Sequence, residues 1–105
     1  MPFVLRFVQR YQPATEKAFM ALEAKFAALE RRHRDFPKGR RSRPYAGREP
    51  VHTLVWECEF ETLALAKKGL DRISSSPEHA RLLKKQVPFF LEAFTEIYEV
   101  LELRP

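Results

Sequence analysis

The sequence contains few of the residues on which several common classes of binding site depend. Its single cysteine, Cys58, cannot form a disulfide within the chain, so a reduced, cytoplasmic setting fits best. With only three glycines in 105 residues, it has no glycine-rich phosphate-binding loop. Its three histidines, His33, His52 and His79, have no partner four residues away and no neighbouring cysteine. We therefore expect neither a metal site nor a cofactor.

Long apolar runs are also missing from the sequence. No stretch approaches the roughly 20 apolar residues that span a bilayer, and the opening MPFVLRFVQRY shows no basic leader followed by an apolar run. We expect a soluble, unprocessed protein without membrane partners. Because 45% of its 105 residues are hydrophobic, the chain can bury one core, and we expect a single domain over residues 1–105.

Positive charge is concentrated in one segment. The net charge is +5, and eight of the nineteen Lys and Arg residues fall within residues 31–49, RRHRDFPKGRRSRPYAGRE. Its prolines and glycines exclude a long helix and leave room for a short edge strand around residues 41–47. We expect a solvated loop, which could gate a pocket, and we expect Arg40, Arg41 and Arg43 to contribute little to stability. Nucleic-acid binding is the alternative interpretation of this segment.

Three segments have the composition or the alternation of strands. Residues 3–11, FVLRFVQRY, alternate with a period of two and have one fully apolar face. Residues 51–60, VHTLVWECEF, are rich in β-branched and aromatic residues and read as a central strand. The tail TEIYEVLEL, residues 95–103, has a mixed pattern that predicts a last strand.

Helical periodicity is strongest in residues 14–34. Apolar residues recur there at three- and four-residue spacing, as on one face of an amphipathic helix. This face consists of Phe19, Leu22, Phe26 and Leu29. We expect the charged residues of the segment, including Glu23 and Glu30, to lie elsewhere on its surface.

A second helical unit follows the central strand in two pieces. Thr62 is a candidate N-cap for the first piece, and Gly69 is expected to loosen its end. Ser76 as N-cap, with Pro77 at the first helical position, starts the second piece, and Pro88 ends it. The resulting order predicts an α+β fold: a ferredoxin-like βαββαβ sandwich, with an antiparallel sheet and two helical segments on one face.

The run HTLVWECEFETLALAKKGL, residues 52–70, followed by a short helix and the terminal EIYEVLEL, resembles the dimeric α/β-barrel superfamily. The similarity is to its small antibiotic-biosynthesis-monooxygenase-like and NIPSNAP-like members, in which a strand ending in an acid and an aromatic residue enters a helix through Ser or Thr. The resemblance implies that the sheet face opposite the helices packs against a partner's sheet and closes a barrel around a small-molecule pocket. It also implies cofactor-independent, monooxygenase-like chemistry as one candidate function.

The chain departs from the pattern of the quinone-forming and haem-degrading members. These typically present an Asn on the first strand, a Trp at the strand-to-helix junction and often a His in the following helix. Here the first strand carries Arg6 and Gln9, Phe60 occupies the junction, and AKKGL stands where a His would be. The departures argue against oxygenase chemistry, and against haem ligation in particular.

Five residues of the two predicted strands form the candidate ligand site: Arg6, Arg10, Thr53, Trp56 and Glu57. Arg6, Arg10 and Glu57 would share a sheet face if the two strands are neighbours. One interpretation is ion pairing between strands or between subunits. The other is a pocket in which Arg6 binds an anionic or carbonyl oxygen and Glu57, its pKa raised by burial, accepts a proton. Trp56 is on the apolar face, where a core role is favoured over a substrate platform.

We expect a homodimer, because two helices cover only one face of a four-stranded sheet whereas both strand faces carry apolar residues. The predicted function is the binding of a small organic molecule in a pocket between sheets, with catalysis left open. A structural or interaction dimer without a ligand is the alternative. Nucleic-acid binding ranks last, because Glu57 and Glu59 would repel phosphate on the strand where RNA-recognition domains stack bases.

Overall fold

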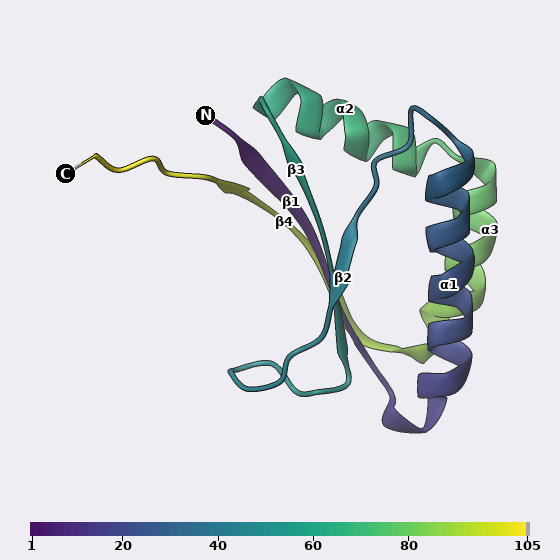
Figure 1. Ribbon diagram of the computed structural model, residues 1–105. Coiled ribbons are helices and arrows are strands. Elements are labelled where there is room, and N and C mark those ends of the chain that lie inside the picture. Colours follow the sequence, from purple (N-terminus) through teal and green to yellow (C-terminus); the bar gives the residue numbers. More distant parts are fainter. Residues whose placement is uncertain (105) are drawn as a thin grey trace.

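The computed structural model describes residues 1–104 and consists of a four-stranded antiparallel sheet with three helices on one face (Figure 1). The elements, in chain order, are β1 (Phe3–Tyr11), α1 (Glu16–Arg32), β2 (Arg40–Ser42), β3 (Thr53–Phe60), α2 (Leu63–Ser74), α3 (Pro77–Gln86) and β4 (Phe90–Glu99). The strand order β2-β3-β1-β4 places β1 and β3 at the centre. The prediction of a ferredoxin-like βαββαβ fold is confirmed, with the second helical unit divided into α2 and α3.

The helix starts agree with the capping residues. The Thr62 hydroxyl accepts a hydrogen bond from the Leu65 N–H at 3.1 Å, and the Ser76 hydroxyl accepts one from the His79 N–H at 3.2 Å. α2 continues past Gly69 to Ser74 and ends just before the predicted N-cap Ser76. A Cβ at Gly69 would lie 2.7 Å from Cζ of the Phe60 ring, so the glycine permits a close approach of α2 to β3.

The last strand is displaced from its predicted position. It begins at Phe90 rather than at residue 95, because Phe90 pairs with Tyr11 and its ring packs edge-on against Phe19 at 5.9 Å. It ends at Glu99, which lies opposite Phe3, the first residue of β1, so no partner strand remains beyond it. The edge strand β2 is also shorter than expected. Within residues 1–104, no helix is long and apolar enough to cross a membrane.

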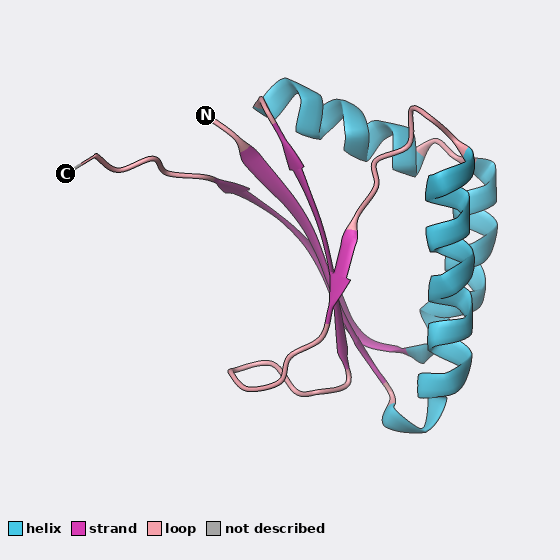
Figure 2. Ribbon diagram, viewed as in Figure 1, coloured by secondary structure: helices cyan, strands magenta, loops and turns pink. Residues whose placement is uncertain are grey.

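The alternation of the central strands decides which face is buried. Leu5 and Tyr11 of β1 point toward the helices, together with Leu54 and Trp56 of β3, and all four side chains are buried. The more apolar face of each central strand therefore packs against the helices. The opposite face of the sheet carries no helix (Figure 2).

We expect Gly39→Ala to lower the free energy of unfolding by about 1–3 kcal/mol, because a Cβ there would lie 1.8 Å from Nε1 of Trp56. The Trp56 ring has little room to move, since it is buried and stacks on Phe7 at 4.8 Å. Urea or thermal denaturation measures the change. Ser42→Ala, at an exposed position of β2, is the control and should stay within about 0.5 kcal/mol of the wild type. Equal stability of the two variants would contradict this packing.

Candidate functional site

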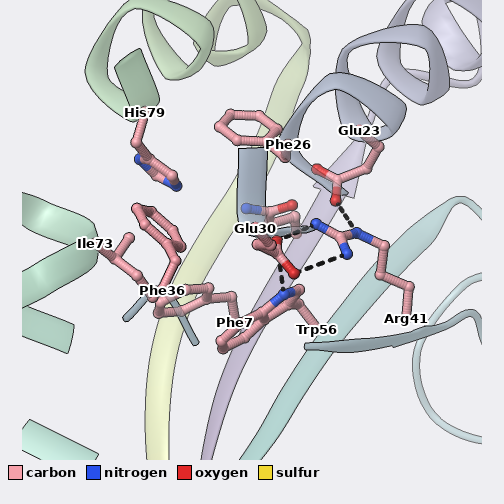
Figure 3. A pocket seen from close by; sticks show the side chains of 10 residues that line it. Phe7, Glu23, Phe26, Glu30, Phe36, Arg41, Trp56, Ile73 and His79 are labelled. Carbon is pink, nitrogen blue, oxygen red and sulfur yellow. Dashed lines mark hydrogen bonds and ion pairs between the residues drawn. The ribbon is translucent and has the colours of Figure 1, made fainter. Parts of the chain in front are cut away.

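A charged cluster lies inside the protein, between β2 and α1 on the helix side of the sheet (Figure 3). Arg41 Nε donates a hydrogen bond to Glu23 Oε2 at 2.5 Å, and Arg41 Nη2 donates to Glu30 Oε2 at 2.6 Å. Both glutamates are more than nine-tenths buried. The expectations that Glu23 and Glu30 lie on the surface and that Arg41 is solvated were therefore wrong.

Three neutral donors complete this cluster. The Gly39 N–H donates to Glu30 Oε1 at 3.0 Å, Trp56 Nε1 donates to Glu30 Oε2 at 3.2 Å, and Gln86 Nε2 donates to Glu23 Oε1 at 3.0 Å. One guanidinium balances the charge of only one of the two carboxylates. The three neutral donors, two to Glu30 and one to Glu23, stabilise the remaining negative charge.

The charge of Arg41 is maintained despite its surroundings. Burial alone would lower the pKa of this guanidinium, but the hydrogen bonds to Glu30 and Glu23 and the charges of both outweigh burial, and the pKa is raised. Arg41 therefore remains a cation and holds β2 against α1.

A small cavity adjoins the cluster, and a larger cleft adjoins this cavity. The cavity has a volume of about 30 Å³, room for a water molecule, and the cleft, between the β1 and β4 side of the sheet and helices α2 and α3, has a volume of about 400 Å³. Four residues line both spaces: Phe7, Gln9, Ile73 and His79. The larger volume falls in the range of roughly 300–1,000 Å³ that is usual for small-molecule pockets.

Two of the residues that line both spaces, Gln9 and His79, are polar. Gln9 Oε1 is buried and, among the described residues, has no hydrogen-bond partner. Burial lowers the pKa of His79, whose ring packs 4.8 Å from that of Phe26, so its imidazole is neutral at neutral pH. The walls therefore offer an unused acceptor and a neutral ring that can donate or accept a hydrogen bond.

Most of the residues predicted to form the site lie on the opposite, helix-free face of the sheet. Arg6 on β1 is flanked by Glu57 on β3, with Nε 3.4 Å from Oε1, and by Glu96 on β4, with Nη1 3.7 Å from Oε1. Ion pairing across strands, one of the two interpretations of Arg6 and Glu57, is thus present. The role of Glu57 as a proton acceptor stays a prediction.

Arg10 lies on the same face with a different set of partners. Its Nε donates to Glu49 Oε2 at 2.8 Å, and its Nη1 is 2.9 Å from Glu92 Oε2. The hydrogen bond from Arg10 lowers the pKa of Glu49. Thr53 lies opposite Arg10 in the β1–β3 ladder and is buried. A hollow of about 260 Å³ in this face is lined by both arginines, Arg6 and Arg10.

Trp56 is separated from the other four predicted site residues by the sheet. Its ring points toward the helices and lines the small cavity beside Arg41. The sequence analysis missed Glu23, Glu30 and Arg41 as a group. A signal was present: Glu23 and Glu30 recur with the spacing of the buried face of α1, where a carboxylate predicts a buried cation.

The described residues offer little for a metal or a reactive thiol. Within residues 1–104, no three His, Cys, Asp or Glu side chains are grouped so that they could hold a metal ion. Burial raises the pKa of the half-buried Cys58 thiol, which keeps it protonated near neutral pH. The chemistry available in the cleft is therefore hydrogen bonding, aromatic contact and proton transfer at His79.

We expect Arg41→Met to cost about 3–5 kcal/mol of folding stability, because it leaves Glu23 and Glu30 buried without a cation. Arg43→Met is the control: this arginine pairs with Glu16 at 3.0 Å but is more than half exposed, and we expect a loss below about 1 kcal/mol. Chemical denaturation measures both losses, and equal losses would show that the buried pairs do not hold β2.

Comparison with known proteins gives a likeness in structure but not in sequence. No protein-family model matches the chain, and no curated protein matches it. Solved structures do match. An uncharacterised NIPSNAP domain protein from Burkholderia xenovorans has a TM-score of 0.77 at 10% identity, covering 98% of each chain.

Two further structures extend the comparison. A NIPSNAP-like domain protein from Burkholderia xenovorans has a TM-score of 0.72 at 18% identity, covering 99% of this chain and 89% of its own. A proposed antibiotic biosynthesis monooxygenase from Nitrosomonas europaea has a TM-score of 0.69 at 11% identity, covering 95% and 90%. The predicted resemblance is confirmed in three dimensions: the chain has the ferredoxin-like fold of NIPSNAP domain proteins and of this monooxygenase-like protein.

Proposed function

We propose that this protein binds a small organic molecule in the cleft of about 400 Å³ between the sheet and helices α2 and α3. The observation that carries the proposal is the unpartnered carbonyl of Gln9, which is buried at the wall of this cleft. A buried acceptor without a donor costs about 1–3 kcal/mol, and a ligand that supplies a hydroxyl or N–H would recover that loss. This proposed pocket lies on the helix side of the sheet. The sequence analysis, in contrast, expected a pocket between two sheets.

The walls indicate what kind of molecule fits. Phe7, Leu70, Leu83 and Ala93 contribute apolar surface, and Gln9, His79 and Thr95 contribute polar groups. This combination suits an apolar or aromatic molecule with one or two hydroxyl or amide groups. If the bound hydroxyl is acidic, the neutral imidazole of His79 can accept its proton. This proton transfer to His79 is what the cleft would contribute to cofactor-independent oxygenation, the chemistry implied by the resemblance to monooxygenase-like proteins.

We expect phenols and aromatic amides to quench or shift the fluorescence of Trp56, the only tryptophan, which stacks on the cleft residue Phe7. A ligand at 100 times its Kd should add about 2.7 kcal/mol to the stability of the protein. Gln9→Leu should weaken binding about fivefold, the value of one hydrogen bond. In the absence of ligand the same variant should be at least as stable as the wild type, because it removes an unpartnered acceptor.

The control for this experiment is Gln12→Leu, since Gln12 is exposed and does not line the cleft. It should leave ligand affinity unchanged. A loss of more than about 1 kcal/mol in ligand-free Gln9→Leu would mean that the carbonyl already has a partner. Measuring oxygen consumption in the presence of a bound phenol separates catalysis from binding. If none of the phenols and aromatic amides changes the fluorescence or the Tm, a structural dimer without a ligand is favoured.

We also propose that the protein is a cytoplasmic homodimer joined through the helix-free face of the sheet. All three helices cover the other face (Figure 1), while this face presents the partly exposed aromatic residues Phe94 and Tyr98 of β4. Apolar surface on a sheet without covering helices is typical of an interface. The aromatic residues of β1 and β3 point toward the helices or the core, which supports ranking base stacking last.

We expect wild-type protein at 100 µM to sediment as a dimer of about 25 kDa, twice the 12.4 kDa chain. Tyr98→Ala, on the helix-free face at a position that is 47% exposed in the single chain, should shift it toward monomer by about 1–2 kcal/mol, because it removes aromatic surface from the interface. Val51→Ala, half exposed just before β3, is the control. Circular dichroism checks that both variants fold. A monomeric wild type would rule out the homodimer, and a Tyr98→Ala protein with unchanged dimer affinity would place the interface elsewhere.

A further inference from the structure

A groove between α1 and α3 gathers basic side chains on the solvent side of the helical layer. The two helices pack side by side (Figure 1), and the groove between them, which we call the α1–α3 groove, has a volume of about 720 Å³. Its lining residues are Lys25, Ala28 and Arg32 of α1 and Glu78, Arg81, Leu82, Lys84 and Lys85 of α3. Five of these eight side chains are basic and one is acidic, so the groove is strongly positive.

This positive charge results from the way α1 divides its charged residues between its two sides. Glu23 and Glu30 turn inward and bind Arg41, while Lys25 and Arg32 remain exposed. Acids that would pair with neighbouring cations along a helix surface are therefore used inside the protein. After its first residue, the exposed side of α1 carries cations but no acid.

Ion pairs within the chain balance this charge at one point only. Arg32 pairs with Glu78 across the groove. Four exposed cations of the groove have no ion pair within residues 1–104: Lys25, Arg81, Lys84 and Lys85. Like charges gathered in one groove repel one another, and a negatively charged partner removes that repulsion. The groove is therefore suited to an acidic partner.

The shape of the groove favours a helical partner over an extended one. Both walls are helices, whose backbone groups are already hydrogen-bonded, so an extended peptide finds no strand edge to pair with. Ala28 and Leu82 are apolar and less exposed than the basic side chains, so they form the floor of the groove. An amphipathic helix can place its apolar stripe on such a floor and its acidic residues beside the basic rim.

Two other polyanionic partners fit this surface less well. None of the lining residues of the groove is aromatic, so the bases of a single-stranded nucleic acid have nothing on which to stack. None is an exposed, large apolar side chain of the kind that enters a bilayer. Charge alone would attract a nucleic acid or an anionic membrane, whereas the apolar floor adds a contact that only the helix uses.

We propose that the α1–α3 groove binds an acidic amphipathic helix of a partner protein. The apolar stripe of that helix lies over Ala28 and Leu82, and its carboxylates lie beside Lys25 and Arg81. The inference goes beyond the ligand cleft and the homodimer proposed above, because the groove belongs neither to the cleft nor to the helix-free face of the sheet. The partner would rest on the outer side of α3, a helix that also lines the cleft.

The experiment uses a fluorescently labelled peptide of about 14 residues, which as a helix is roughly 21 Å long and spans the ten residues of α3. Leucines at helical spacing form its apolar stripe, and glutamates and alanines fill the other positions. Fluorescence anisotropy should show micromolar binding to the wild type in 50 mM salt. The Kd should rise about fivefold in 150 mM salt, because the contacts at the rim are electrostatic.

A pair of double variants with the same change in net charge locates the binding surface. Lys25→Glu/Arg81→Glu should raise the Kd at least about tenfold, because it places acids on both walls of the groove. The control is Lys67→Glu/Arg34→Glu, at exposed positions outside the groove, and should change the Kd by less than about twofold. Circular dichroism checks that both proteins fold. Equal weakening by the two variants would show attraction to overall charge and would overturn the proposal.

Ala28→Lys separates a helix packed on the floor from a partner held by charge alone. The variant adds a cation but places a long side chain on the floor, so we expect it to weaken peptide binding about threefold. Tighter binding would overturn the proposal. So would tighter binding of an oligo-thymidine strand, or of vesicles of phosphatidylserine and phosphatidylcholine, than of the peptide, if Lys25→Glu/Arg81→Glu abolishes it.

Changes in the peptide test the proposal without altering the protein, which covers the case in which a variant does not fold. A peptide with glutamine in place of glutamate should not bind the wild type, because it has no charge to offer the rim. A peptide of the original composition, reordered so that its leucines form no stripe, should bind at least about fivefold more weakly. Equal binding of either peptide would contradict an acidic amphipathic helix as the partner.

Discussion

The placement of one guanidinium in the interior determines much of this structure. Arg41 draws β2 onto α1 by hydrogen bonds to Glu23 and Glu30, and the same Glu30 accepts from the indole of Trp56 and the backbone of Gly39. Since a lone buried carboxylate is costly, each of these groups depends on the others. The network therefore joins the edge strand, the central strand β3 and the long helix, and it forms one wall of the cavity beside the cleft.

The fold could be predicted because its signals are local. Alternation in residues 3–11 and the periodicity of α1 reflect burial on one face, and the Thr62 and Ser76 caps mark helix starts by short-range chemistry. The limits of β4 were not predictable in this way. They depend on where the partner strand β1 ends and on the packing of Phe90 against Phe19, which are contacts between distant parts of the chain.

The site was predicted in part, and the reason is similar. Strand alternation and element order were enough to place Arg6, Arg10, Thr53 and Glu57 on one face of the sheet. They could not reveal that Arg41, in a segment rich in solvated arginines, is partly buried and paired with two glutamates, because the charge of a residue says nothing about its partner. The unpartnered carbonyl of Gln9 is likewise invisible in the sequence, since only the surroundings determine whether an amide is satisfied.

The two edges of the sheet differ in their ability to accept another strand. The β2 edge has only three residues, and it carries Arg41 pointing inward, an arrangement that resists further strand addition. The β4 edge is ten residues long and exposes Leu91 and Ile97. A fibre that grows by pairing sheets edge to edge needs two open edges on every chain. With one edge blocked, growth through backbone pairing stops once β4 of one molecule meets β4 of another, so the fold limits polymerisation without covering its longer edge.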